Sequence, residues 1–175
     1  MLRQPELSAQ CVDLLFNSPV PVENSLLAQL GPAGRRRLLG DAQPVALDFS
    51  QLLSEPGDRT GHVYFPIDGF VSLITPGVGR RQLEVGLVGD EGMLGVQLLL
   101  GVDVSPLRAM VQGAGHAWRV RKSDFLKELT LNPALRDALN RYLYVFLAQL
   151  LQTATCTRSS RRWWRSTARN AASAR

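Results

Sequence analysis

Histidine and cysteine, the residue types that most often bind catalytic metals, are scarce in this chain of 175 residues. The two histidines, His62 and His116, are some fifty positions apart, and neither lies in a His-x-His arrangement. A cupin-like metalloenzyme on a small β-barrel would need two or three histidines and a carboxylate. Cys11 and Cys156 also lack neighbours with metal-ligand spacing, so we expect two free thiols in a reducing cytoplasm. The sequence therefore predicts no metal site and no catalytic activity.

Long hydrophobic runs are missing as well. No stretch approaches the roughly 18–20 apolar residues of a membrane span, and the N-terminus lacks the apolar segment of a secretory signal. An apolar content of 45% with 20% charged residues is typical of a globular protein. We expect a cytoplasmic protein that does not enter a membrane.

Acidic residues are absent from the last eighteen positions, 158–175, which carry six arginines. The net charge of +5 therefore arises in this segment alone, because residues 1–157 hold 14 basic and 15 acidic residues. A basic tail of this kind favours nucleic acid or an anionic surface, but its Arg, Ser and Ala bias is equally typical of a disordered segment. We expect residues 156–175 to be a disordered basic tail.

From Gln43 to Arg121 the chain alternates between short β-type runs and glycine-containing turns. Many short strands at regular spacing favour an antiparallel sandwich or barrel. The predicted fold is mainly β with flanking helices, arranged as a small closed antiparallel roll. The seven expected strands are Pro44–Phe49, Leu52–Ser54, Val63–Phe65, Phe70–Thr75, Leu83–Val88, Leu107–Gln112 and Ala117–Arg121.

Helical patterns flank these strands. After an N-terminal arm (1–23) with at most a short helix near 12–16, capping residues predict short helices at 24–30, 32–40 and 125–131. A long helix is expected over 132–155. Its apolar residues nearly encircle it between 142 and 151, which favours a homodimer in which a second copy covers one face. The predicted dimerisation residues are Leu135, Leu139, Tyr142, Leu143, Phe146 and Leu150.

Four glycines follow one another at a spacing of three: Gly86, Gly89, Gly92 and Gly95. A short helix is expected directly afterwards, over Val96–Leu100. Glycine backbone amides beside a helix N-terminus can bind an anion, and an arginine normally supplies the opposite charge. Arg108 is the nearest arginine downstream, with Arg80 and Arg81 as alternatives. The predicted effector-binding residues are Gly92, Gly95, Val96, Gln97 and Arg108.

Two strings in this region carry a family resemblance: Val63-Tyr-Phe-Pro-x-x-Gly69-x-Val-Ser-Leu, and Glu84-Val-Gly-Leu-Val-Gly-x-Glu91-Gly-Met-x-Gly95. They resemble the sensor domain of Crp/Fnr-type bacterial transcription regulators. The resemblance implies a β-roll of the cyclic-nucleotide-binding type over 24–131, followed by a dimerisation helix over 132–155. It also implies a small effector, such as a cyclic nucleotide, and a winged helix-turn-helix that reads DNA in full-length relatives.

The sequence departs from this pattern in two ways. Val96 stands where nucleotide-binding members carry a glutamate, and Ser105 stands at the usual arginine position, with Arg108 displaced. We therefore expect no binding of cyclic AMP in the usual way, and another effector or none. Residues after 156 do not resemble the winged helix, which suggests a truncated or frame-shifted end, so DNA binding would need a full-length relative. A stand-alone ligand-binding module without a DNA role is the alternative.

Overall fold

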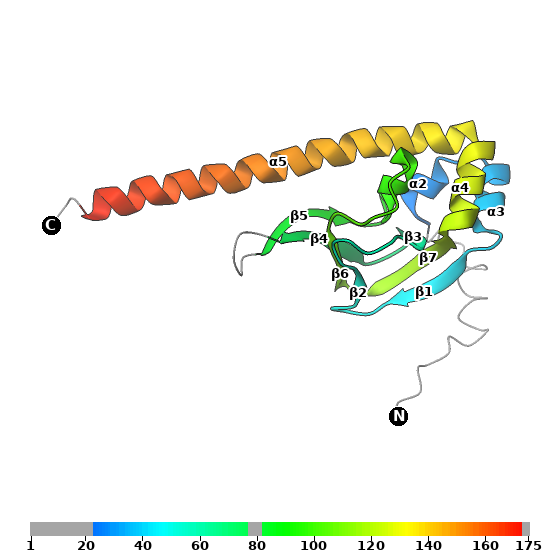
Figure 1. The fold of residues 1–175 in the computed structure, drawn as a ribbon, viewed down its shortest axis with the longest axis horizontal. Coiled ribbons are helices and arrows are strands. Elements are labelled where there is room, and N and C mark those ends of the chain that lie inside the picture. Colours follow the sequence, from blue (N-terminus) through cyan, green and yellow to red (C-terminus); the bar gives the residue numbers. More distant parts are fainter. Residues whose placement is uncertain (1–22, 77–81, 173–175) are drawn as a thin grey trace, which may run out of the picture.

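A computed structural model describes the backbone over residues 23–76 and 82–172, and the side chains over 23–75 and 83–153 (Figure 1). Residues 1–22 of the predicted arm (1–23), with its helix near 12–16, and Arg80 and Arg81 lie outside the described residues. So do the side chains of both cysteines.

Within the described residues, seven antiparallel strands form two sheets, which confirms the predicted fold class. One sheet has the order β1-β7-β3 and the other β2-β6-β4-β5. All seven predicted strands are present to within a couple of residues at each end. Their bounds are β1 Gln43–Leu47, β2 Leu52–Ser54, β3 His62–Pro66, β4 Phe70–Pro76, β5 Gln82–Val88, β6 Arg108–Gly113 and β7 Gly115–Arg121.

Strand β3 shows how the alternation of side chains divides the roll into two faces. Val63 and Phe65 are fully buried, whereas His62 and Tyr64 are only partly buried. Successive side chains of a strand point to opposite faces, and β3 and β7 both contact helix α4 (Lys122–Leu131). One face of this sheet therefore packs under the helices, and the other, carrying His62 and Tyr64, faces the inside of the roll.

The short helices gather at one end of the roll (Figure 1). They are α2 Ser25–Ala28, α3 Pro32–Leu39 and α4, with the 3-10 helix η1 at Val96–Leu100. Proline at the first position of α3 suits a helix start, because its missing N–H would be unpaired there anyway.

Asn24, which is fully buried, connects three parts of the chain. Its Oδ1 accepts hydrogen bonds from the backbone N–H groups of Leu26 and Leu27 and so caps α2. Its Nδ2 donates to the carbonyl oxygens of Pro66, at 2.9 Å, and Gly92, at 2.8 Å. One amide group therefore joins the first described helix to the end of β3 and to the loop after β5.

Helix α5 spans Pro133–Ala172, crosses β5 and continues beyond the roll (Figure 1). The sequence placed its end near 155 and a disordered tail after it, whereas the backbone is helical through Ala172. No proline or glycine occurs between 134 and 172, and Arg, Ala and Gln are good helix formers. The basic composition that suggested disorder therefore contains no signal that ends a helix.

Candidate effector-binding site

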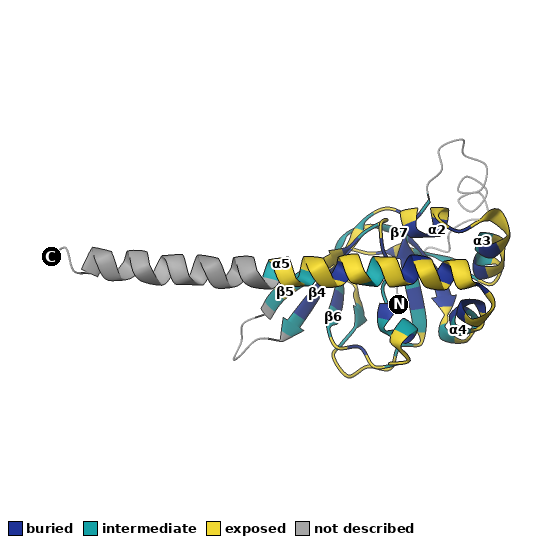
Figure 2. Ribbon diagram, turned by 90° about the horizontal axis from the view of Figure 1, so that it is seen from above, coloured by how far each residue is buried: buried dark blue, intermediate teal, exposed yellow. Residues whose placement is uncertain are grey.

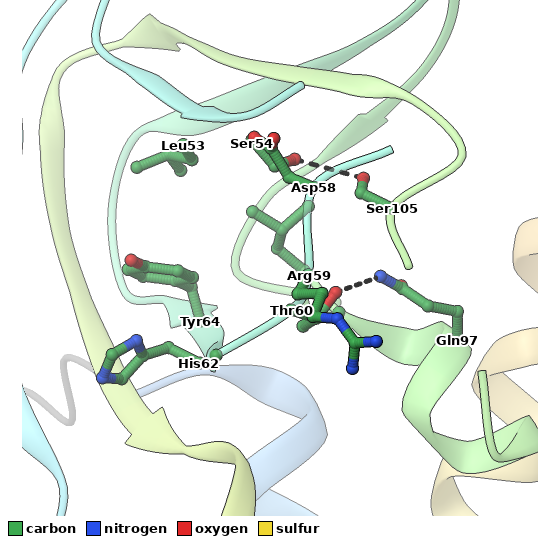
Figure 3. Close-up of a pocket in the computed structure, with 12 residues that line it drawn as sticks. Leu53, Ser54, Asp58, Arg59, Thr60, His62, Tyr64, Gln97 and Ser105 are labelled. Atoms are coloured by element: carbon green, nitrogen blue, oxygen red, sulfur yellow. Dashed lines mark hydrogen bonds between the residues drawn. The ribbon is translucent and has the colours of Figure 1, made fainter. Parts of the chain in front are cut away.

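A cavity of about 390 Å³ opens on the inner side of the roll, between β2, β3 and η1 (Figure 3). Its volume lies within the range of pockets that bind small molecules. Its residues come from β2, the β2–β3 loop, β3, and the segment that leads through η1 to β6. They are Leu53, Ser54, Asp58, Arg59, Thr60, Gly61, His62, Tyr64, Leu94, Gly95, Gln97 and Ser105.

Hydroxyl and amide groups form much of the polar wall of this cavity. The Ser54 and Ser105 hydroxyl oxygens lie 3.2 Å apart, and the Ser105 hydroxyl donates to the carbonyl of Leu107 at 2.8 Å. Across the cavity, Gln97 Nε2 donates to Thr60 Oγ1 at 2.9 Å (Figure 3). These bonds hold polar groups in fixed orientations, where they can recognise the polar atoms of a ligand.

Gly95 makes the turn that places η1 beside the cavity. Its φ of +97° lies in the left-handed region, and an added Cβ would stand 2.9 Å from Val63 Cγ1. Glycine adopts such a conformation without a steric penalty. The following residues then diverge, because Gln97 lines the cavity whereas Val96 is buried in the core.

Two other glycines of the series, Gly86 and Gly92, allow helix α5 to approach. An added Cβ at Gly92 would lie 2.5 Å from the hydroxyl of Tyr142, and one at Gly86 would lie 3.1 Å from Leu150 Cδ2. Tyr142 donates to the carbonyl of Met93 at 3.3 Å, and burial raises the pKa of its phenol to about 12. Gly86 and Gly92 thus contact the helix and do not line the cavity.

Arg108, the predicted countercharge for an effector, is bound by a carboxylate. Its Nη2 lies 2.9 Å from Glu55 Oε1, and its Nε donates to Glu55 Oε2 at 3.0 Å. Such a two-point pair uses the geometry with which arginine also binds phosphate. Of the predicted effector residues, Gly95 and Gln97 therefore line the cavity, and Gly92, Val96 and Arg108 are engaged elsewhere.

A second set of charges includes Arg59, which lines the cavity. Asp103 contacts both Arg59, at 3.1 Å, and Lys122, at 3.0 Å. The hydrogen bond from Lys122 and its positive charge hold the pKa of Asp103 below its ordinary value, and Arg59 contributes less. Asp103 and its two positively charged partners, Arg59 and Lys122, form a small network in which the Arg59 side chain stays largely exposed.

His62 and Tyr64 line the cavity, and neither was among the residues predicted from the sequence to bind the effector. Burial lowers the pKa of His62, and the neighbouring Arg119 and Arg121 lower it further. The alternation in His62-Val63-Tyr64-Phe65 was the available signal, since it separates two partly polar residues from two core residues.

Helix α5 packs on the roll through the residues that were predicted to form the dimer. Leu135, Leu139 and Phe146 are buried in the core of their own chain, and Tyr142, Leu143 and Leu150 pack against that core. The exposed side of the helix faces away from the roll (Figure 2). It carries Tyr144, Leu147 and Leu151, which are 76%, 50% and 69% exposed.

The part of the chain that the structure describes contains neither a membrane-spanning helix nor a cluster of metal-binding side chains. None of its helices is long and apolar enough to cross a membrane. The described residues also contain no group of three or more histidine, cysteine, aspartate or glutamate side chains arranged to hold a metal ion.

Solved structures share this fold. The c-di-GMP-responsive regulator CLP of Xanthomonas campestris matches with a TM-score of 0.62 at 20% identity, over 71% of this chain and 63% of CLP. The DNR sensor domain of Pseudomonas aeruginosa matches with a TM-score of 0.57 at 19% identity, over 73% of this chain and 85% of that one. The catabolite activator protein of Thermus thermophilus matches with a TM-score of 0.58 at 19% identity, over 77% and 61%.

These likenesses confirm the fold that the resemblance predicted, the β-roll of Crp/Fnr-type sensor domains. At identities near 20% they show the fold alone. The match covers 63% of the length of CLP, which is less than two thirds. No protein-family profile and no curated protein matches the chain.

Proposed function

We propose that this chain is the effector-sensing and dimerisation domain of a Crp/Fnr-like transcription regulator. One observation carries the proposal. The segment from Gly92 to Gln97 contacts α5 through Gly92 and Met93. The same segment lines the cavity at Leu94, Gly95 and Gln97. A ligand that moves this segment would therefore act on the helix through Tyr142, whose hydroxyl is bonded to Met93.

The exposed side of α5 supports a homodimer. Tyr144, Leu147, Ala148 and Leu151 follow the i, i+3, i+4, i+7 spacing of one helix face, and all four are exposed. Isolated exposed apolar residues are common, but a continuous apolar stripe on a long helix favours a partner helix. The proposed contact thus uses the face opposite to Leu139 and Phe146, and a second copy is the proposed occupant.

Cyclic AMP is not the proposed effector in its usual mode of binding. Glu55 already makes both contacts that Arg108 would offer to a phosphate, and the side chain of Val96 is in the core. A cyclic phosphate would have to displace the carboxylate of Glu55. Calorimetric titration is expected to show no binding of cyclic AMP at micromolar concentrations, and binding in that range would contradict this part of the proposal.

Sedimentation equilibrium tests the dimer. The wild-type chain is expected to sediment as a dimer and Leu147→Arg as a monomer, because an unpaired charge would be buried at the centre of the stripe. Gln149→Arg is the matched control, since Gln149 is exposed on another side of the helix and should leave the dimer intact. A monomeric wild type, or equal dissociation of both variants, would refute this interface.

A stand-alone ligand-binding module without a DNA role is the remaining candidate. It would share the cavity and the dimer, so neither measurement above separates the two. A gel-shift assay at controlled salt does so, when the sensor domain is joined to the winged-helix domain of a relative. Effector-dependent binding to DNA is expected under the present proposal.

A further inference from the structure

We propose that the effector is a small primary amine, and that Ser54, Asp58 and Ser105 bind its ammonium group. The inference rests on the proposed role of the cavity as an effector site and adds the chemical class of the ligand. All three residues line the cavity, where β2 ends and the β2–β3 loop begins to turn. A cation thus replaces the anion that the glycine series predicted.

The turn after β2 brings these three residues together. The backbone N–H of Gly57 donates to the carbonyl of Ser105 at 2.9 Å, and the N–H of Ser105 donates to the carbonyl of Asp58 at 2.8 Å. The carboxylate of Asp58 accepts from the N–H of Glu55, the residue after Ser54, at 2.8 Å. These bonds hold the carboxylate and the two serines at one corner of the cavity before a ligand arrives (Figure 3).

The two serine hydroxyls at this corner use their protons within the protein. Ser105 donates to the carbonyl oxygen of Leu107 at 2.8 Å. The Ser54 oxygen lies 3.2 Å from the Ser105 oxygen and 3.5 Å from the same carbonyl oxygen, so its single proton is donated to one of them. The lone pairs that remain on both serine oxygens can only accept a hydrogen bond.

The Asp58 carboxylate is the third acceptor, and it has no cation beside it. One of its oxygens, Oδ2, accepts from the Glu55 backbone, whereas Oδ1 accepts from no described residue. Among the described residues, no arginine, lysine or histidine forms an ion pair with Asp58, and the adjacent Arg59 is paired with Asp103. An ionised carboxylate only accepts hydrogen bonds. Every open group at this corner is therefore an acceptor.

An ammonium group matches the corner in both number and charge. It carries three N–H donors and no acceptor, and the corner offers two hydroxyl oxygens and a carboxylate. Hydrogen bonds in which one or both groups are ionised are the stronger ones. A phosphate or carboxylate would instead face acceptors only, and a hydroxyl group would bring a single donor. The corner thus favours a primary ammonium group over an anion or an alcohol.

Positive charge elsewhere in the cavity does not call for an anionic ligand. Arg59 lines the cavity, but Asp103 lies 3.1 Å from its Nη1, and its side chain is 84% exposed. Burial lowers the pKa of His62, and the charges of Arg119 and Arg121 lower it further, so the neutral imidazole is favoured. The lining residues therefore leave the Asp58 carboxylate as the charge without a partner.

The rest of the cavity indicates the body of the amine. The ring of Tyr64 and the side chains of Leu53 and Leu94 form an apolar part of the lining. In the close-up, Leu53 and Tyr64 lie to one side of Ser105 (Figure 3). Small-molecule pockets commonly combine an apolar wall with a few fixed polar groups. An amine that carries an aromatic ring on a short chain fits both parts.

Calorimetric titration with phenethylamine tests the proposal, with 2-phenylethanol and phenylacetate as its neutral and anionic counterparts. We expect the wild-type chain to bind the amine, the alcohol more weakly, and phenylacetate most weakly. Asp58→Asn keeps an acceptor for the Glu55 N–H but removes the charge, and should weaken amine binding by roughly tenfold or more. Asp48→Asn removes the same charge at an exposed position outside the cavity and should change binding little.

Three calorimetric results would overturn the proposal. They are failure of phenethylamine to bind, equal binding of the amine and the alcohol, and equal losses in the two variants. Binding of phenylacetate in place of the amine would also refute the cationic class, but it would leave the proposed function standing because the cavity would still hold an effector.

Backbone amide resonances supply a second readout and show whether Asp58→Asn is folded. The amine should shift the N–H resonances of Glu55 and Ser105, which bond to Asp58, and Asp58→Asn should reduce these shifts at the same amine concentration. Shifts confined to residues outside the cavity would contradict the placement. Shifts at Ser105 without any response at Met93 or Tyr142 would support the amine site and contradict the proposed coupling to α5.

Discussion

The contact between Gly92 and Tyr142 yields a sharp prediction for Gly92→Ala. A Cβ at this position would lie 2.5 Å from the Tyr142 hydroxyl oxygen and 2.8 Å from Cε2 and Cζ of the ring. Carbon atoms in ordinary contact are about 3.5–4.0 Å apart, so the ring or the loop must move. Because Tyr142 packs against the core under α5, the movement would disturb the helix contact as well.

The size of the effect follows from overpacking in other proteins. Inserting a methyl group into a filled site typically costs about 1–3 kcal/mol. For a chain of this length, each kcal/mol corresponds to about 2–4 °C in melting temperature. Urea denaturation of Gly92→Ala should therefore show a lower midpoint. Gly61→Ala is the control, because no atom lies within 4 Å of its added Cβ, and its stability should stay within about 0.5 kcal/mol of the wild type.

A double-mutant cycle with Tyr142→Ala assigns the cost to this contact. Removing the ring leaves room for the new methyl group, so Gly92→Ala should be nearly neutral in that background, or stabilising by the smaller entropy of the unfolded chain. An equal cost of Gly92→Ala with and without the Tyr142 ring would refute the reasoning. The loss would then arise in the loop itself.

Three further predictions concern the wall, the helices and the core. The pKa of His62 is lowered from 6.5 in the folded state, so the unfolded chain binds a proton more readily. The free energy of unfolding should therefore fall as the pH drops below about 6.5. His62→Gln should remove the contribution of His62 to this pH dependence, measured as urea midpoints at a series of pH values. Glu128→Ala leaves Arg37 Nε and Asn132 Nδ2 without their acceptor and should cost about 1–3 kcal/mol in denaturant titrations at an unchanged m-value. Phe125 is fully buried, and Phe125→Ala should cost about 3–5 kcal/mol by calorimetry; a loss below about 1 kcal/mol would show that the helix end can collapse around the site.

The strands were predictable because their signal is local. The alternation of side chains lies within a run of five to seven residues, and the glycine-containing turns lie directly beside it. Strands β3 and β4 could therefore be placed from the sequence with little error. The end of α5 was less accessible. Composition suggested a disordered tail, but a helix continues until a residue stops it, and neither proline nor glycine occurs up to Ala172.

The site was predictable only in part, because its decisive contacts join distant residues. Gly95 and Gln97 lie where the glycine series placed them, beside the cavity. The pairing of Arg108 with Glu55 spans 53 positions and leaves no mark in either local sequence. The apolar pattern of α5 likewise could not say which face packs on its own roll, because Leu139 and Leu147 look alike in sequence although the first is buried and the second exposed.

The four hydrogen bonds of the Asn24 side chain have a consequence for how the molecule opens. A helix of four residues has no stability of its own, and α2 depends on a side chain that is fastened to β3 and to the Gly92 loop. Helix α2 therefore cannot unravel without also releasing the carbonyls of those segments. In hydrogen-exchange terms, the amides of Leu26 and Leu27 belong to the same cooperative unit as the roll, although they lie in the first described helix of the chain.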